Sequence, residues 1–171
     1  RTITPREPFE LKPILGPPAG IRCTAVSTGG TFPRHVPLER ALGLDHTGAV
    51  VGLFIEEGSK RIAFFPGAPR VVPEWLEQMA DCDAIFFDGT FWSDDELIRM
   101  QGHGHTAREM GHSPVSGSDG TIEKFSTLSG PRKIFIHINN TNPMLDEDSP
   151  EYQHLSASGW ELAFDGMELS L

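Results

Sequence analysis

Three residues able to bind a metal or move a proton, Asp88, His112 and His137, lie in short polar segments beside predicted strands or helices. Asp88 follows the apolar run DAIFF, His112 lies within MGHSPVSG, and His137 lies within IFIHINNTNP. α/β enzymes build their sites where strands give way to loops. Carboxylates suit hard cations, and imidazoles are common nitrogen ligands. Asp88 and His137 are therefore candidate metal ligands, and His112 is a candidate general acid or base.

Each candidate also has a structural interpretation that the sequence leaves open. Asp88 precedes Gly89 and could bond its own backbone in a turn. His137 could be a buried histidine that is satisfied by one hydrogen bond. His112 could be an ordinary histidine of a surface loop.

The other candidate sites are weaker. His103 and His105 form a Gly-His-Gly-His segment, and its glycines predict a flexible loop rather than a preorganised ligand pair. His35 and His46 could supply a further ligand, but no spacing argument selects one of them. The run DEDSPE is typical of a helix N-terminus, and no GxSxG motif is present to support a serine nucleophile.

Length and composition limit the classes of protein. A chain of 171 residues with 38% hydrophobic content predicts one domain, and a net charge of −10 disfavours nucleic acid as a partner. Cys23 and Cys82 form no CxxC motif, so we expect reduced thiols in the core. Neither a membrane-spanning apolar run nor a signal peptide is present, which predicts a cytoplasmic protein. The start at Arg1, without Met, suits a segment of a longer protein.

The elements that would position these residues can be predicted from apolar periodicity and turn signals. We expect an extended or loop segment over 1–20 and a closing hairpin of 160–164 with 167–171. The other predicted strands are 21–27, 49–56, 61–67, 83–87 and 132–138. The predicted helices are 73–81, 93–100, 106–109, 119–128 and 149–159. The stretch 29–45 has no clear pattern. This order of elements is typical of a layered α/β sheet.

The chain resembles the C-terminal half of the pyrroloquinoline quinone biosynthesis protein B family, within the metallo-β-lactamase fold superfamily. The resemblance is carried by FFDGTFWSDDEL, TAREMGH, IFIHINNTNPMLDEDSPE and GWELAFDGMELSL, over residues 86–97, 106–112, 134–151 and 159–171. It implies an α/β fold of the αββα sandwich type. Residues 1–171 would form a single partial domain.

The resemblance also implies a function. The parent protein would be a cytoplasmic bacterial enzyme of pyrroloquinoline quinone biosynthesis that hydroxylates a tyrosine-derived precursor with iron, or with zinc as the alternative metal. Asp88 and His137 would be metal ligands, and His112 an acid/base residue or substrate contact. Asn139, Asn140 and Asn142 would shape the substrate pocket.

Two other functions remain open for the parent protein: a metal-dependent hydrolase, and a non-catalytic carrier that transports pyrroloquinoline quinone or its precursor. The superfamily's main ligand cluster belongs to an N-terminal half that the resemblance does not cover, so that half is an expected partner, and a homodimer is possible. A third ligand cannot be named from the sequence. Because a catalytic metal usually takes three protein ligands, we expect the chain alone to bind metal weakly or not at all.

Overall fold

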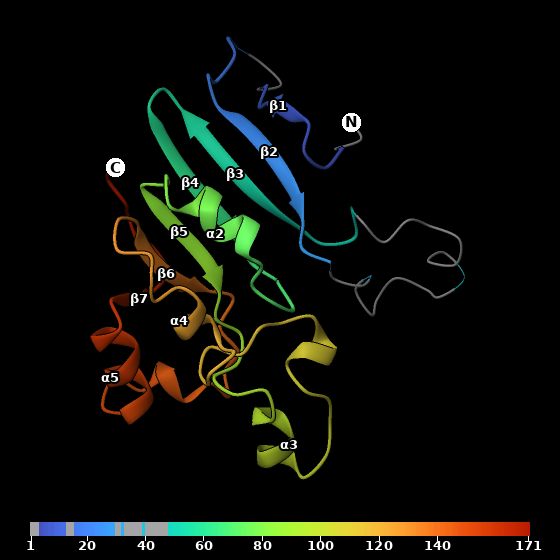
Figure 1. Cartoon of the computed structure of the whole chain (residues 1–171), viewed down its shortest axis with the longest axis vertical. Helices are drawn as coiled ribbons and strands as arrows, with labels where there is room; N and C mark the ends of the chain where they lie inside the picture. Colours follow the sequence, from blue (N-terminus) through green and yellow to red (C-terminus); the bar gives the residue numbers. More distant parts are fainter. Residues whose placement is uncertain (1–3, 13–15, 30–31, 33–38, 40–47) are drawn as a thin grey trace.

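The computed structural model describes residues 4–12, 16–29, 32, 39 and 48–171, and it is built on one seven-stranded sheet. The strands lie in chain order across the sheet (Figure 1). They are β1 (Pro8–Glu10), β2 (Arg22–Ser27), β3 (Val51–Glu57), β4 (Lys60–Phe65), β5 (Ala84–Asp88), β6 (Arg132–Ile136) and β7 (Trp160–Leu162). Pairs within β1 to β4 are antiparallel, whereas pairs within β4 to β7 are parallel.

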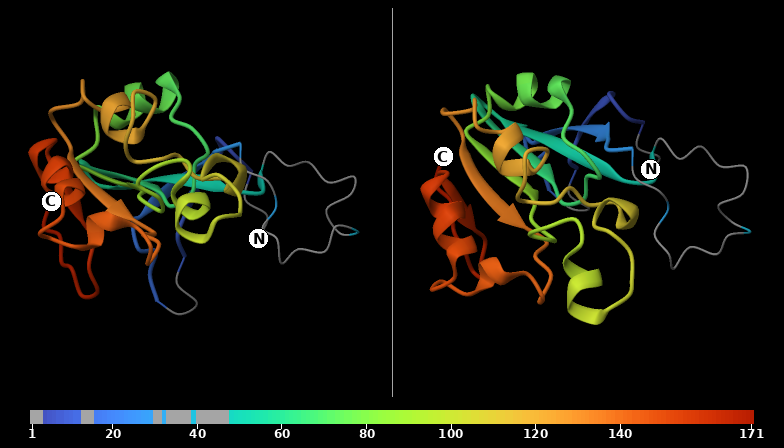
Figure 2. Two further views of the ribbon diagram at one scale, coloured as in Figure 1. Left: turned by 90° about the horizontal axis from the view of Figure 1, so that it is seen from below. Right: turned by 60° about the horizontal axis from the view of Figure 1, so that its bottom comes forward.

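Short helices occupy the connections of the parallel half. The α-helices are α2 (Pro73–Met79), α3 (Glu96–Gln101), α4 (Thr121–Lys124) and α5 (Pro150–Ala157), and the 3-10 turns are η2 (Arg108–Met110) and η3 (Pro143–Leu145). Figure 2 shows α2 and α4 on the same side of the sheet. None of the described helices has the length and apolar character needed to cross a membrane.

The core lies between the sheet and these two helices. Aromatic rings from alternate strand positions form a continuous layer. The ring centroid of Phe65 lies 5.2 Å from that of Trp75 in α2, and the ring centroid of Phe87 lies 5.0 Å from that of Phe125 after α4. A β-carbon on Gly52 of β3 would overlap the Phe65 ring, so only glycine leaves room for that ring. Burial of these rings is the main source of stability for the sheet that carries the candidate residues.

The opposite face of the sheet carries apolar side chains that remain partly accessible. Ile55 pairs with Ile62, and Leu53 and Phe86 both pair with Phe64, which is 37% exposed. This face of the sheet therefore exposes apolar surface. Self-association through it, including a homodimer, stays a prediction.

Most of the predicted elements are confirmed within one to three residues, including the hairpin of β3 with β4, the buried strand β5, and helices α2 and α5. Helix α5 begins as expected, with Ser149 Oγ accepting a hydrogen bond from the Tyr152 amide at 3.0 Å. Cys23 and Cys82 are buried and unpaired, as predicted. His35, His46 and most of the stretch 29–45 lie outside the described residues.

Two local predictions are wrong. The C-terminal hairpin does not form: β7 pairs parallel with β6, because Trp160 stacks on Phe135 with ring centroids 3.9 Å apart. Residues 163–171 contain no strand. The helix predicted over 119–128 is limited to α4, whereas the strand predicted over 132–138 is confirmed within two residues as β6.

Two segments have the Ser/Thr-x-x-Glu spacing of a capping box, Ser93 to Glu96 and Thr106 to Glu109, and their outcomes differ. At η2 the box is confirmed, because Thr106 Oγ accepts from the Glu109 amide and Glu109 accepts from the Thr106 amide. The box of Ser93 with Glu96 is wrong. Glu96 is only 3% exposed, and its carboxylate accepts hydrogen bonds from the Trp92 amide at 2.6 Å and the Thr141 hydroxyl at 2.6 Å.

Candidate metal centre

Parallel pairing of β5 with β6 brings Asp88 and His137 together. Asp88 is in register with Ile136, the residue before His137, and the Gly89 amide donates to the Ile136 carbonyl at 2.8 Å. The loops that follow the two strands meet at the same edge of the sheet (Figure 1). His137 has φ = 58°, in the left-handed region that is unfavourable for a non-glycine residue. Such strain is often retained at functional sites.

His112 reaches the same place from the loop between η2 and α4. The His112 amide donates to the Ala107 carbonyl at 2.9 Å, and the Val115 amide donates to the Phe91 carbonyl at 2.9 Å. The second of these bonds ties the loop to the segment after β5. The His112 imidazole then stacks on the His137 imidazole, with centroids 5.2 Å apart and planes 20° apart. The structure therefore places all three predicted residues at one site.

Asp88 is fully buried, and its carboxylate accepts four hydrogen bonds. Oδ1 accepts from the Thr90 amide at 3.1 Å and from the Thr90 hydroxyl at 2.6 Å. Oδ2 accepts from the Ala68 amide at 3.1 Å and from His112 Nδ1 at 2.8 Å. Because a carboxylate only accepts, His112 Nδ1 carries the proton in this contact, and its Nε2 lone pair remains for a ligand or a proton.

The Thr90 hydroxyl contacts every member of this group. Its oxygen lies 3.0 Å from His112 Nδ1, 2.8 Å from His137 Nδ1 and 2.9 Å from the His137 carbonyl, in addition to Asp88. A hydroxyl has one proton, so when it donates to Asp88 it accepts from His137 Nδ1, and it can share the His112 Nδ1 proton with Asp88 Oδ2. Thr90 thereby holds both rings with the same nitrogen turned inward.

Asp88, His112 and His137 fit a metal ion by their chemistry and their spacing. Each offers one ligand atom, and these three atoms lie within 4.8 Å of one another. Two imidazoles and a carboxylate are ligands used for zinc and for iron. The chain thus offers three candidate ligands, and the third, His112, is identified by the structure and not by the sequence. The metal-ligand roles of Asp88 and His137, and the acid/base role of His112, stay predictions.

The three asparagines predicted to contact substrate have different environments. Asn142 is 2% exposed, and its side chain donates to the Gly89 and Thr90 carbonyls and accepts from the Met144 amide. Its side-chain amide is thus engaged within the loop, and a substrate contact by Asn142 stays a prediction. Asn139 is half-buried and donates to the Thr141 hydroxyl at 2.5 Å. Asn140 is exposed, and substrate contacts by Asn139 and Asn140 stay predictions.

Two residues of the site were missed by sequence reasoning. Thr90 follows Asp88 by two positions, and its place in the DGT segment was the available signal. Glu96 joins the loop after β5 to the loop after β6 through Trp92 and Thr141. The capping-box spacing concealed this role. His103 is exposed, and His105 Nδ1 lies 3.5 Å from the Glu109 carboxylate, apart from the three candidate ligands.

Comparison with known proteins shows the family of the chain. Residues 1–138 match the model of the beta-lactamase superfamily domain. Coenzyme PQQ synthesis protein B of Gluconacetobacter diazotrophicus is 39% identical over 99% of this chain and 58% of the relative, and that of Xanthomonas axonopodis pv. citri is 39% identical over 97% and 56%.

A solved structure shows the same fold. Zn(2+)-bound PqqB from Methylobacterium extorquens has a TM-score of 0.87 and 38% sequence identity, and the match covers 100% of this chain and 55% of that chain. The chain therefore spans a little over half the length of the relatives it matches. The α/β fold expected from the sequence is confirmed. The chain belongs to the beta-lactamase superfamily, and over nearly its whole length it is homologous to coenzyme PQQ synthesis protein B.

Proposed function

We propose that this chain provides metal ligands for an enzyme of pyrroloquinoline quinone biosynthesis that hydroxylates a tyrosine-derived precursor with iron. The observation that carries the proposal is the convergence of Asp88, His112 and His137, whose ligand atoms lie within 4.8 Å of one another. The names of the homologous proteins support a role in pyrroloquinoline quinone biosynthesis. The reaction itself rests on the family resemblance.

In this proposal the chain's own residues hold and orient the centre. His112 and His137 bind the ion through Nε2, because their Nδ1 atoms face Thr90. Asp88 binds through a carboxylate oxygen and fixes His112 through its other contacts. A bound iron ion with open coordination positions would supply the oxygen chemistry that hydroxylation requires. The Asn140 side chain is exposed and available to a substrate, while Asn142 supports the loop.

A metal-dependent hydrolase is the second candidate function. The Methylobacterium extorquens relative is described as Zn(2+)-bound, and zinc lowers the pKa of bound water so that it becomes a nucleophile. The same three residues would hold the zinc. Dioxygen consumption supported by iron favours the hydroxylase, whereas zinc-supported hydrolysis of an ester or amide favours the second candidate.

Metal titration of the chain tests the proposal directly. With three candidate ligands we expect one equivalent of Zn²⁺ or of Fe²⁺ under anaerobic conditions, in place of the weak binding expected from two ligands. Asp88→Ala and His137→Ala should each abolish stoichiometric binding. The matched control, His103→Ala, removes an exposed imidazole and should bind like the wild type.

The His112→Ala variant separates the two roles of His112. Loss of the metal identifies a ligand, whereas retention of the metal with loss of turnover in the full-length protein identifies an acid/base residue. The proposal is refuted if the folded wild-type chain takes up no metal, or if Asp88→Ala and His137→Ala bind it unchanged.

A further inference from the structure

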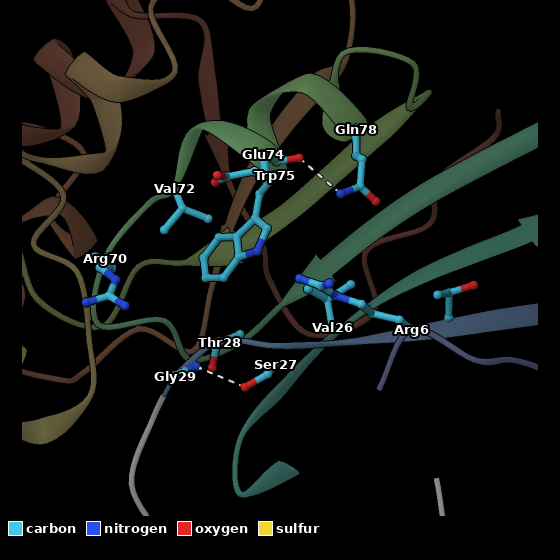
Figure 3. Close-up of a pocket in the computed structure, with 11 residues that line it drawn as sticks. Arg6, Val26, Ser27, Thr28, Gly29, Arg70, Val72, Glu74, Trp75 and Gln78 are labelled. Atoms are coloured by element: carbon cyan, nitrogen blue, oxygen red, sulfur yellow. Dashed lines mark hydrogen bonds between the residues drawn. The ribbon is translucent and has the colours of Figure 1, made fainter. Parts of the chain in front are cut away.

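A cavity separate from the metal centre lies between α2 and the end of β2 (Figure 3). Its volume of about 620 Å³ lies within the usual range for small-molecule sites. The buried side chains of Val26 and Trp75 provide an apolar wall, and Thr28 adds a hydroxyl. None of the three candidate metal ligands lines it.

The charges around this cavity are unusual for the chain. Five arginines of the described residues make ion pairs with carboxylates: Arg22, Arg61, Arg99, Arg108 and Arg132. The remaining two in the described residues are Arg6 and Arg70, and both line the cavity. Neither makes an ion pair within the part of the chain that the structure describes. In a protein of net charge −10, two unpaired cations at one cavity indicate an anion as ligand.

The two arginines approach from separate segments. Arg6 precedes β1, Arg70 precedes α2, and Figure 3 shows them on opposite sides of Trp75. Arg6 has φ = 69°, an unfavourable conformation that is held by a hydrogen bond of 2.6 Å from its amide to the Ala25 carbonyl. Glu74 is the one acidic residue among those that line the cavity, so the lining keeps a net positive charge.

We propose that this cavity binds a small organic dicarboxylate, with one carboxylate on Arg6, the other on Arg70, and the carbon skeleton against Trp75 and Val26. The planar guanidinium group pairs with a carboxylate through two parallel hydrogen bonds. Phosphate shares this oxyanion chemistry, but a single phosphate presents its charge at one point. Two separated guanidinium groups favour two separated acidic groups.

Isothermal titration calorimetry at constant ionic strength tests the site with three probes: benzene-1,3-dicarboxylate, benzoate and inorganic phosphate. We expect the dicarboxylate to bind with one-to-one stoichiometry and at least about tenfold more tightly than the other two. Arg6→Gln and Arg70→Gln should each weaken dicarboxylate binding about tenfold or more, because each removes a charge-assisted pair. Glu74→Gln should tighten binding, since it removes a like charge.

Arg99→Gln is the matched control, because it removes an arginine that does not line the cavity, and it should bind like the wild type. Each variant is first shown to be folded by its thermal unfolding. The inference is overturned if the wild type does not bind the dicarboxylate, if phosphate or benzoate binds equally well, or if the Arg6 and Arg70 variants bind unchanged. Failure of zinc or iron binding would leave these outcomes unaffected, because no metal ligand lines the cavity.

Discussion

Replacement of Thr90 by valine should weaken metal binding without removing any ligand. Valine has nearly the shape of threonine, so the change deletes the hydroxyl and leaves the packing volume almost unchanged. That hydroxyl lies between 2.6 and 3.0 Å from Asp88 Oδ1, from the Nδ1 atoms of His112 and His137, and from the His137 carbonyl. Without it, His137 Nδ1 has no hydrogen-bond partner among the described residues.

The size of the effect follows from these contacts. A hydrogen bond to a charged group contributes about 1.5–3 kcal/mol, and loss of a partner that orients a metal ligand lowers affinity about 10- to 100-fold. A tenfold change in Kd corresponds to about 1.4 kcal/mol, so the roughly 10- to 100-fold loss of affinity matches the energy of the lost hydrogen bond. We therefore expect Thr90→Val to raise the zinc Kd about 10- to 100-fold. Thr90→Ser keeps the hydroxyl and should retain most of the affinity.

The assay is competition with a chromophoric zinc chelator, supported by the visible spectrum of the cobalt-substituted chain, which reports ligand geometry. Thr121→Val is the matched control. Thr121 is buried, as Thr90 is, but its hydroxyl donates only to the Pro114 carbonyl at 3.3 Å. The reasoning fails if Thr90→Val binds zinc as tightly as the wild type, or if Thr121→Val loses as much affinity as Thr90→Val.

The part of the site that lies on strands could be predicted from the sequence. The runs before Asp88 and His137 are continuous and apolar, as expected of strands covered on both faces. Parallel neighbours end at the same edge of a sheet, so two polar residues at their ends become neighbours. The structure places them in this way, with Asp88 in register with Ile136.

The part of the site that depends on loops could not be predicted. The segment around His112 has no periodicity, and its position depends on hydrogen bonds to the carbonyls of Phe91 and Trp92, more than twenty residues away. Thr90 has no distinguishing pattern either, because a hydroxyl after an Asp-Gly turn is common. Tertiary contacts alone determine that it bonds two histidines from other segments.

The error at the C-terminus has a related cause. Strand periodicity does not specify which neighbour a strand pairs with, or in which direction. WELAF and MELSL are joined by Asp-Gly, the usual signal of a hairpin. The stacking of Trp160 on Phe135 and the ion pair of Arg132 with Glu161 at 2.7 Å instead hold β7 against β6.

The remaining predictions concern the core. Burial raises the pKa of the Cys82 thiol to about 11, so its alkylation by iodoacetamide at pH 8 should be much slower than that of a peptide thiol. The folded state keeps this proton longer than the unfolded state, so this contribution to stability falls as pH rises from 9.0 towards 11. Alkylation of Cys82 at the peptide rate would contradict this. Gly52→Ala should lower the free energy of unfolding in urea by about 1–3 kcal/mol, because the added methyl group overlaps the Phe65 ring. Gly48→Ala is its control, since a β-carbon there meets nothing within 4 Å, and its cost should stay within about 0.5 kcal/mol. Equal costs for the two variants would show that the sheet moves to accept the methyl group. The aromatic layer behind Asp88 would then be less rigid than these ring contacts indicate.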